Sequence, residues 1–247
     1  DQFHLTAVGK FMAKLPIDPR LSRMIHEAAK LGCLEEIVII ASALSIQDPR
    51  ERPLEKAQAA DEAHKMFADA RSDFMSLLNI WDQYQMFTQE KKSTGQKKRY
   101  CKSHFLSFKR MREWQDIYSQ IAWLLKENRL NIGPSDPVAR FAANDRYERL
   151  YAAIHQSVLS GFLSNIAHRL EKQYFKAAGD KEVMIFPGSG LFRNPGSWIV
   201  AAEIVETSRL FARNVANIEK DWLEFYGKNL CRATYSNPRW SGKRGEV

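Results

Sequence analysis

The first two thirds of the chain repeat apolar residues at the spacing of α-helices. Residues 19–32 carry an apolar residue every three or four positions and end on Gly32, so they predict an amphipathic helix with a glycine C-cap. Residues 34–46 are apolar on every side, and their Ile-Val-Ile-Ile run is compatible with a buried strand. Their length and their Ala and Ser content favour a helix in the core.

Two longer amphipathic segments follow. Residues 72–87 begin with Ser72 as a candidate N-cap and Asp73 in the first turn, and residues 103–128 keep one face apolar. The lysine-rich residues 88–102 between them predict a polar loop. Residues 145–163 predict a further helix, whereas residues 5–19, with their glycine and prolines, predict a short hairpin or turn.

The pattern changes after residue 163. Short β-branched and aromatic runs alternate with breaks at 179–180 and 187–196, which predicts several short strands and a small β-barrel. Residues 206–215 predict a strand–loop–strand unit, and residues 220–230 a closing helix. The predicted fold class is α + β and multidomain: an all-α helical bundle followed by a small β-barrel. No internal repeat is evident.

Charge adds a class of partner to this picture. The chain has 247 residues, a formal net charge of +8 and a pI near 9.4, which favours an anionic partner. Nucleic acid is the first candidate and an anionic membrane surface the second, while a basic domain without such a partner stays open. No apolar run approaches the ~18 residues of a membrane span.

The cysteines indicate the cellular compartment, and the first residues indicate whether the chain is part of a longer protein. Cys33, Cys101 and Cys231 are far apart and form no CxxC pair, which argues against a zinc site or a disulfide framework and favours a reducing cytoplasm. The histidines show no metal-ligand spacing. The chain opens on Asp1 without an apolar leader, so we expect a fragment of a longer protein.

The tetrapeptide Asp61-Glu62-Ala63-His64 spells the motif that names a class of nucleic-acid-dependent ATPases. In such enzymes the acidic residues follow a buried strand, where they reach Mg²⁺ and the attacking water. Here the preceding residues 55–60 are strong helix formers, and no GxxxxGK[ST] phosphate loop is present. We therefore predict an ordinary helix with Asp61 and Glu62 toward solvent, and no catalytic residues. An autonomous ATPase built on this pair is the least favoured interpretation.

A cationic window covers residues 89–112. It contains nine Lys or Arg and a single acid, Glu90, which is the concentration that phosphate backbones require, although residues 91–98 are also compatible with a solvated loop. Residues 206–215 add hydroxyl and guanidinium groups. Phe186, Phe192 and Trp198 are candidates for base stacking, with barrel core favoured. The predicted RNA-binding residues are Lys97, Arg99, Lys102, Lys109, Arg110, Arg112, Thr207, Ser208, Arg209 and Arg213.

Several strings resemble one family. "LTAVGKFMAKLPIDPRLSRMI" is similar to the end of the winged-helix domain of DEAH-box RNA helicases, and "SDFMSLLNIWDQY" and "YCKSHFLSFKRMREWQDIYSQI" resemble helices of the ratchet bundle that follows it. "MIFPGSGLF" with "SWIVAAEIVETSRLFARNVANIEKDWL" resembles the family's OB-fold, and "REWQDIY" is most similar to the bacterial HrpA type. The chain departs from the family at Pro187–Gly190 and Ala201–Ile204, so side-chain contacts made there by other members are not transferred.

The resemblance implies the C-terminal region of an ATP-dependent RNA helicase. The implied domains are the end of a winged helix (1–20), a ratchet bundle (21–130), a connecting segment and helix (131–162) and an OB-fold with a helix and tail (163–247). ATP and Mg²⁺ would belong to motor domains elsewhere in the parent, with no cofactor here. The implied partners are single-stranded RNA, ribosomal or messenger, and the motor domains in cis, with no membrane. A scaffold that docks an acidic protein or the ribosome is the alternative.

Overall fold

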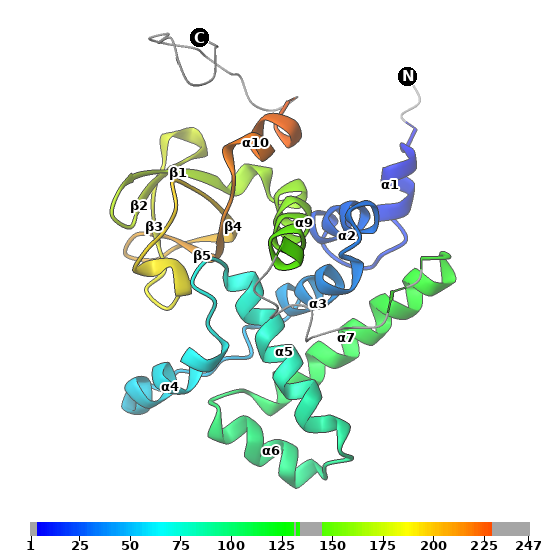
Figure 1. Ribbon diagram of the computed structural model, residues 1–247, viewed down its shortest axis with the longest axis vertical. Helices are drawn as coiled ribbons and strands as arrows, with labels where there is room; N and C mark the ends of the chain where they lie inside the picture. Colours follow the sequence, from blue (N-terminus) through cyan, green and yellow to red (C-terminus); the bar gives the residue numbers. More distant parts are fainter. Residues whose placement is uncertain (1–3, 131, 134–144, 229–247) are drawn as a thin grey trace.

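The computed structural model describes residues 4–130, 132–133 and 145–228. It shows a helical bundle beside a β-barrel, with the long helix α7 on the side of the bundle away from the barrel (Figure 1). Among the described residues, no helix combines the length and apolar character that crossing a membrane requires. The helices are α1 (Ala7–Met12), α2 (Pro19–Leu31), α3 (Leu34–Leu44), α4 (Ala57–His64), α5 (Asp73–Gln89), α6 (Thr94–Ser103), α7 (Phe108–Glu127), α9 (Asp145–Gly161) and α10 (Lys220–Tyr226).

The predicted end of α2 at Gly32 and the predicted start of α5 at Ser72 are confirmed. Asp18 caps α2 by accepting the backbone N–H of Arg20 at 2.8 Å, and Gly32 ends it at φ 73°, a left-handed conformation that glycine adopts without a Cβ clash. The Ser72 hydroxyl accepts the N–H groups of Phe74 and Met75 at the start of α5. Local capping chemistry therefore sets these boundaries.

Two local expectations are wrong and a third is right in part. Residues 5–19 contain the expected turn, but the short helix α1 precedes it and no hairpin forms. The expected loop contains α6, which starts with a reciprocal capping box between Ser93 and Gln96. Helix α7 starts at Phe108 and not at 103, because Phe105 has φ 51° and the N–H of Ser107 bonds instead to the carbonyl of Pro49.

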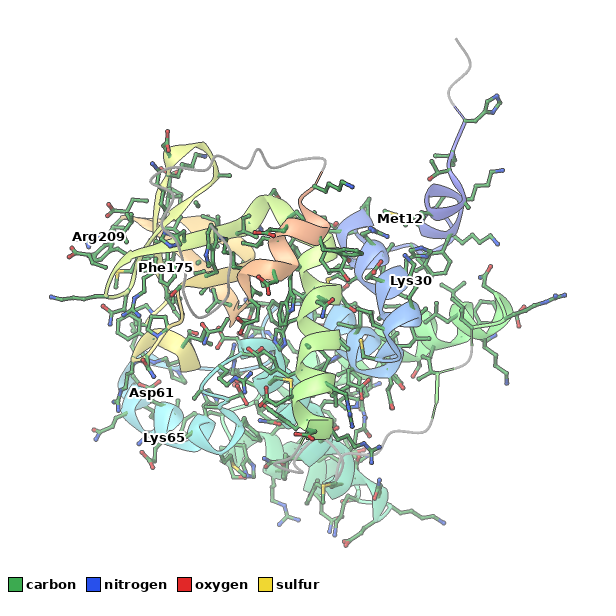
Figure 2. The ribbon with its side chains drawn as sticks, turned by 45° about the horizontal axis from the view of Figure 1, so that its top comes forward. Met12, Lys30, Asp61, Lys65, Phe175 and Arg209 are labelled. Atoms are coloured by element: carbon green, nitrogen blue, oxygen red, sulfur yellow. The ribbon has the colours of Figure 1, made fainter. Side chains whose placement is uncertain are left out.

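The second half confirms the predicted small barrel. Five strands close in the order β1-β2-β3-β5-β4, and all neighbours are antiparallel except the parallel pair β3 and β5. Phe175 is fully buried in the interior (Figure 2). The strands are β1 (Ile166–Glu171), β2 (Tyr174–Ala177), β3 (Glu182–Ile185), β4 (Trp198–Glu206) and β5 (Leu210–Asn217).

The first half of strand β4 is buried on both faces, which explains its run of apolar residues. Ile199 and Ala201 point into the barrel core, whereas Val200 and Ala202 belong to the core of the helical bundle. A strand buried on both sides loses the usual alternation of apolar and polar positions. The barrel wall made by β4 and β5 is therefore also a wall of the bundle.

A buried polar network closes the junction between the two parts. His155 of α9 is fully buried. Its Nδ1 donates a hydrogen bond to the carbonyl of Tyr151, and its Nε2 accepts a hydrogen bond from the hydroxyl of Ser72, both at 2.6 Å. The next residue, Asp73, accepts the N–H groups of Gly190 and Val215 with its two carboxylate oxygens, at 3.1 and 3.0 Å. The Ser72-Asp73 dipeptide thus joins α5, α9 and the barrel.

Candidate nucleic-acid interface

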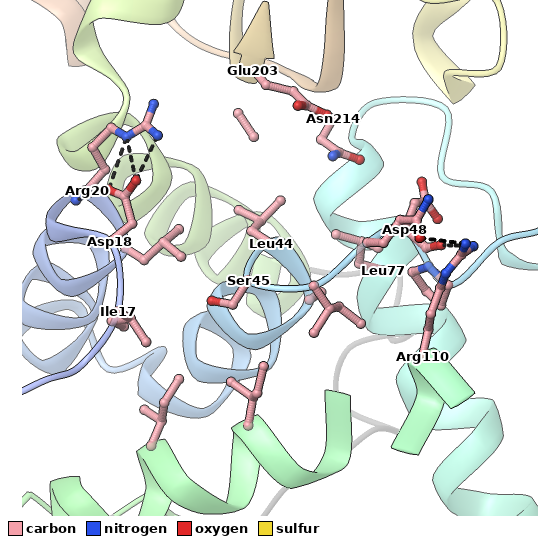
Figure 3. A pocket seen from close by; sticks show the side chains of 18 of the residues that line it. Ile17, Asp18, Arg20, Leu44, Ser45, Asp48, Leu77, Arg110, Glu203 and Asn214 are labelled. Atoms are coloured by element: carbon pink, nitrogen blue, oxygen red, sulfur yellow. Dashed lines mark hydrogen bonds and ion pairs between the residues drawn. The ribbon is translucent and has the colours of Figure 1, made fainter. Parts of the chain in front are cut away.

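A cleft of about 850 Å³ lies where the bundle faces the barrel. Its walls are the start of α2, the end of α3 with the residues after it, one face of α7, and the neighbouring strands β4 and β5. Figure 3 shows Asp18 and Arg20 on one side, Asp48 and Arg110 on the other, and Glu203 with Asn214 above. The polar side chains therefore come from segments that are far apart in the sequence.

Two copies of the tripeptide Asp-Pro-Arg stand in this cleft, thirty residues apart in the chain. Asp18 accepts the backbone N–H of Arg20 at 2.8 Å and binds its guanidinium in a fork at 3.1 and 2.8 Å. Asp48 repeats the arrangement with Arg50, at 2.9 Å for the N–H and at 3.0 and 2.7 Å for the guanidinium. In each tripeptide the arginine folds back past the proline and binds the aspartate two residues before it. The aspartate therefore holds the arginine side chain in place.

The two pairs differ in their surroundings. The side chains of Arg20 and Asp18 are 51% and 39% exposed, whereas those of Arg50 and Asp48 are 21% and 27% exposed. Burial works against the charged form of Asp48, but the adjacent Arg50 outweighs it and holds the pKa of Asp48 below its ordinary value. The same pairing raises the pKa of Arg50 against the effect of its own burial. Both groups therefore stay ionised at neutral pH.

Arg110 and Arg213 were predicted from separate parts of the sequence, and the structure brings them to the same cleft. Arg110 donates to the carbonyl of Asp48 at 3.0 Å and to the side-chain oxygen of Gln47 at 2.6 Å. Arg213 lies 3.9 Å from a carboxylate oxygen of Glu203, a loose ion pair. Neither guanidinium is held by a close carboxylate within the described part of the chain, so both keep capacity for an anion.

An aromatic ring accompanies these charges. Phe186 is 38% exposed, and the guanidinium of Arg213 lies 4.9 Å from the centre of its ring. The expectation that Phe186 belongs to the barrel core is wrong, because the residue follows the end of β3 and packs edge-on against Phe211. Phe192 and Trp198, by contrast, are partly buried and pack against the two cores.

Charge distinguishes this cleft from the cavity at the far end of the barrel. Four arginines and three carboxylates line the cleft, a net charge of +1. The other cavity, of about 900 Å³, has Arg209 among Glu171, Glu182 and Glu206, a net charge of −2. Arg209 points outward there (Figure 2) and donates to the hydroxyl of Tyr174 at 2.6 Å. The predicted residues Thr207 and Ser208 also line this acidic cavity, away from Arg110 and Arg213.

The remaining predicted residues lie outside both cavities. Lys97, Arg99 and Lys102 are on α6, and Lys109 and Arg112 are on the first turns of α7.

The cleft residues that were not predicted from the sequence include Arg20, Arg50 and Asn214. The repeated Asp-Pro-Arg tripeptide was a visible signal for the two arginines. Asn214, with φ 49°, has no comparable signal.

The Asp61–His64 tetrapeptide lies on α4, as predicted. Asp61 and Glu62 are exposed and pair with Arg52 and Lys65, and Figure 2 shows Asp61 and Lys65 at the surface. Ala60 and Phe67 are buried. His64 Nε2 lies 3.0 Å from the carbonyl of Phe105. A carboxylate pair on a solvent-facing helix lacks the strand-end setting of an ATPase motif, and its ion pairs show an ordinary helix surface.

Comparison with known proteins defines the class of these two parts. Residues 18–77 match the helicase associated domain (HA2), ratchet-like, and residues 154–230 match the oligonucleotide/oligosaccharide-binding (OB)-fold. The bundle is therefore a helicase-associated ratchet and the closed five-stranded barrel is an OB-fold.

Two relatives identify the particular type. The chain is 46% identical over 244 residues to an ATP-dependent RNA helicase HrpA homolog of Haemophilus influenzae, and 43% identical over 246 residues to the ATP-dependent RNA helicase HrpA of Escherichia coli. These alignments cover 98% and 99% of this chain and 18% of each relative. The chain thus spans about a fifth of their length, and it belongs to the HrpA type of helicase region.

Proposed function

We propose that this region holds single-stranded RNA in the cleft between the ratchet bundle and the OB-fold. The observation that carries the proposal is the convergence of Arg110 and Arg213, from α7 and β5, on one cleft with a net positive charge. Guanidinium groups present a planar fork of donors that fits phosphate oxygens. Arg20 and Arg50, held by their own aspartates, add pre-oriented donors to the same walls.

The surroundings of the cleft suit an unpaired strand. Single-strand-binding surfaces combine cations for the backbone with aromatic rings for the bases. Phe186, partly exposed beside Arg213, supplies a ring at the barrel side. Base stacking tolerates any sequence, so the proposed grip is independent of sequence.

The activity of the parent protein is part of the proposal. The two relatives are named ATP-dependent RNA helicases. A parent of this kind would use ATP and Mg²⁺ in its motor domains. This region would hold the RNA between successive ATP-driven steps of those domains, and the protein would act in the cytoplasm. The proposed divisions are 1–20 as the end of a winged helix, 21–130 as the ratchet, 131–162 as a connection and 163–247 as the OB-fold with its tail, of which residues 229–247 lie outside the described part.

Binding of a fluorescent oligouridine to the 247-residue chain tests this proposal. The double substitution Arg110→Gln with Arg213→Gln is expected to weaken binding at least about tenfold, or ~1.4 kcal/mol. The slope of log affinity against log salt should become shallower by roughly 0.7 for each phosphate that the variant no longer neutralises. The matched control is Arg129→Gln with Arg149→Gln, which removes the same charge from exposed positions outside the cleft.

Two results would contradict the proposal. One is equal affinity of the cleft variant and the control, with thermal unfolding showing that both variants are folded. The other is undetectable oligouridine binding by the unmodified chain at low salt, which would favour the scaffold alternative.

A further inference from the structure

The outward face of α6 is cationic and carries no acidic residue. Lys98, Arg99 and Lys102 are exposed, Lys97 is half-buried at the edge of the face, and Cys101 points into the core. These four cations, here called the α6 surface, have no ion pair within the part of the chain that the structure describes. No carboxylate of the described residues therefore forms an ion pair with them.

The α6 surface is held on an ordered helix. The Ser93–Gln96 capping box fixes its first turn, and Tyr100 packs between Phe87 and His104, at ring-centre distances of 4.4 and 4.1 Å. The ammonium of Lys98 lies 5.8 Å from the ring centre of Phe108, which sets α6 beside the start of α7. The cations thus project from a defined platform, unlike those of a solvated loop.

The α6 surface is separate from the cleft. None of its residues lines the cleft, and Figure 1 places α6 at the end of the bundle away from the barrel. Arg110 lies between the two regions, because it reaches the cleft from the first turn of α7, where its neighbours Lys109 and Arg112 are exposed. A path of positive charge therefore leads from the cleft toward α6.

The kind of RNA that fits α6 follows from what its surface lacks. Among the described residues, the large apolar side chains that are exposed include none on α6, and the partly buried Tyr100 is covered by Phe87 and His104, so this face offers no exposed ring for an unpaired base. A duplex hides its bases and presents phosphates and 2′-hydroxyls, which proteins contact largely by shape and charge. Cations without an exposed ring suit a duplex. The cleft suits a single strand, because Phe186, next to the cleft residue Arg213, supplies a partly exposed ring.

We infer that the α6 surface binds the phosphate backbone of an RNA duplex. The inference adds a second form of RNA to the proposed function but stands on a different surface, so each can fail without the other. Together they describe a region that holds a duplex at α6 while one of its strands continues into the cleft.

The test compares two probes and three variants of the 247-residue chain. The probes are a blunt RNA duplex of about 16 base pairs, the length that compact double-strand-binding domains span, and an oligouridine that cannot pair. The α6 variant is Lys98→Gln with Arg99→Gln and Lys102→Gln, because glutamine preserves helix propensity. The matched control, Lys10→Gln with Lys126→Gln and Lys181→Gln, removes the same charge from exposed positions elsewhere. The third variant is the Arg110/Arg213 cleft variant.

The α6 variant is expected to bind the duplex at least about tenfold more weakly, with a salt slope shallower by roughly 0.9 for each phosphate that it no longer neutralises. Its oligouridine affinity should match that of the control, and the cleft variant should show the reverse preference. Duplex binding that is equal in the α6 variant and the control, or undetectable in the unmodified chain, would overturn the inference. Loss of duplex binding together with undetectable oligouridine binding would support the inference and contradict the proposed function.

Discussion

The carboxylate of Asp73, at the start of α5, accepts the backbone N–H of Val215 in β5 at 3.0 Å. Its other oxygen accepts the N–H of Gly190 at 3.1 Å. Burial raises the pKa of Asp73 above its ordinary value, and the two N–H donors oppose that rise. A buried acid from the helical bundle thus satisfies two backbone groups of the barrel.

Substitution of Asp73 should uncouple the two parts. In Asp73→Ala both N–H groups lose their acceptor, so the free energy of unfolding is expected to fall by about 2–5 kcal/mol. Asp73→Asn retains one acceptor oxygen and should cost less. Urea unfolding measures both values, with Asp116→Asn on the exposed side of α7 as a control that should change stability by less than ~0.5 kcal/mol. A small effect of Asp73→Ala would show that the junction does not depend on this carboxylate.

His155 should make the chain sensitive to acid. Burial lowers the pKa of His155 from 6.5 to about 3, so the neutral ring is the folded form and its contribution is fully present above pH 6.5. As pH falls from 6.5 toward 3, the unfolded state takes up a proton that the folded state does not. The stability of the unmodified chain, relative to His155→Gln, should therefore decrease by about 1.4 kcal/mol per pH unit in that range.

Urea unfolding of both proteins at pH 7 and pH 5 checks this prediction. Other titrating groups contribute equally to the two proteins, so only the difference between them reports on His155. If the free energy of unfolding changed equally with pH in both proteins, titration of His155 would not be the cause of the acid sensitivity.

The two Asp-Pro-Arg turns should respond differently to the same substitution. Asp48→Ala leaves the largely buried Arg50 without its carboxylate and is expected to cost about 2–4 kcal/mol of unfolding free energy. Asp18→Ala removes an exposed pair and an N-cap, with an expected cost of about 1 kcal/mol, mostly from the cap. Thermal unfolding of the two variants gives the comparison. Equal costs would indicate that burial does not separate the two turns.

Gly161 allows the end of α9 to approach α2. A Cβ at this position would lie 2.4 Å from the carbonyl oxygen of Arg20 and 2.8 Å from Met24 Cγ. Gly161→Ala should therefore force the two helices apart and cost about 1–3 kcal/mol. Gly95→Ala is the matched control, because its nearest neighbour would be 3.9 Å away on the exposed α6, where alanine favours the helix. Similar stability changes in the two variants would contradict close packing at Gly161.

Sequence patterns predicted the elements whose signals are local. The Ser72 cap, the Gly32 terminus and the β-branched runs after residue 163 each act within a few residues, and the corresponding elements are present. The missed helix α6 also had a local signal, the Ser93–Gln96 capping box, which the lysine-rich composition obscured.

Other features depend on contacts between distant residues. The late start of α7 depends on the carbonyl of Pro49, and the parallel pairing of β3 with β5 depends on closure of the barrel. The sequence identified Arg110 and Arg213 as cationic candidates but could not place them together, because their cleft exists only once β5 packs on the bundle. It grouped Arg213 with Arg209, although the first half of β5 separates the positive cleft from the acidic cavity.

The double burial of β4 has a mechanical consequence. Because Val200 and Ala202 lie in the core of the bundle while Ile199 and Ala201 fill the barrel, a single strand is packed into the cores on both sides of the cleft. Separating the barrel from the bundle would expose both cores to water and break the two hydrogen bonds that Asp73 accepts from the barrel. We therefore expect the two walls of the cleft to keep a fixed spacing, so that a strand held there would lie in a rigid channel.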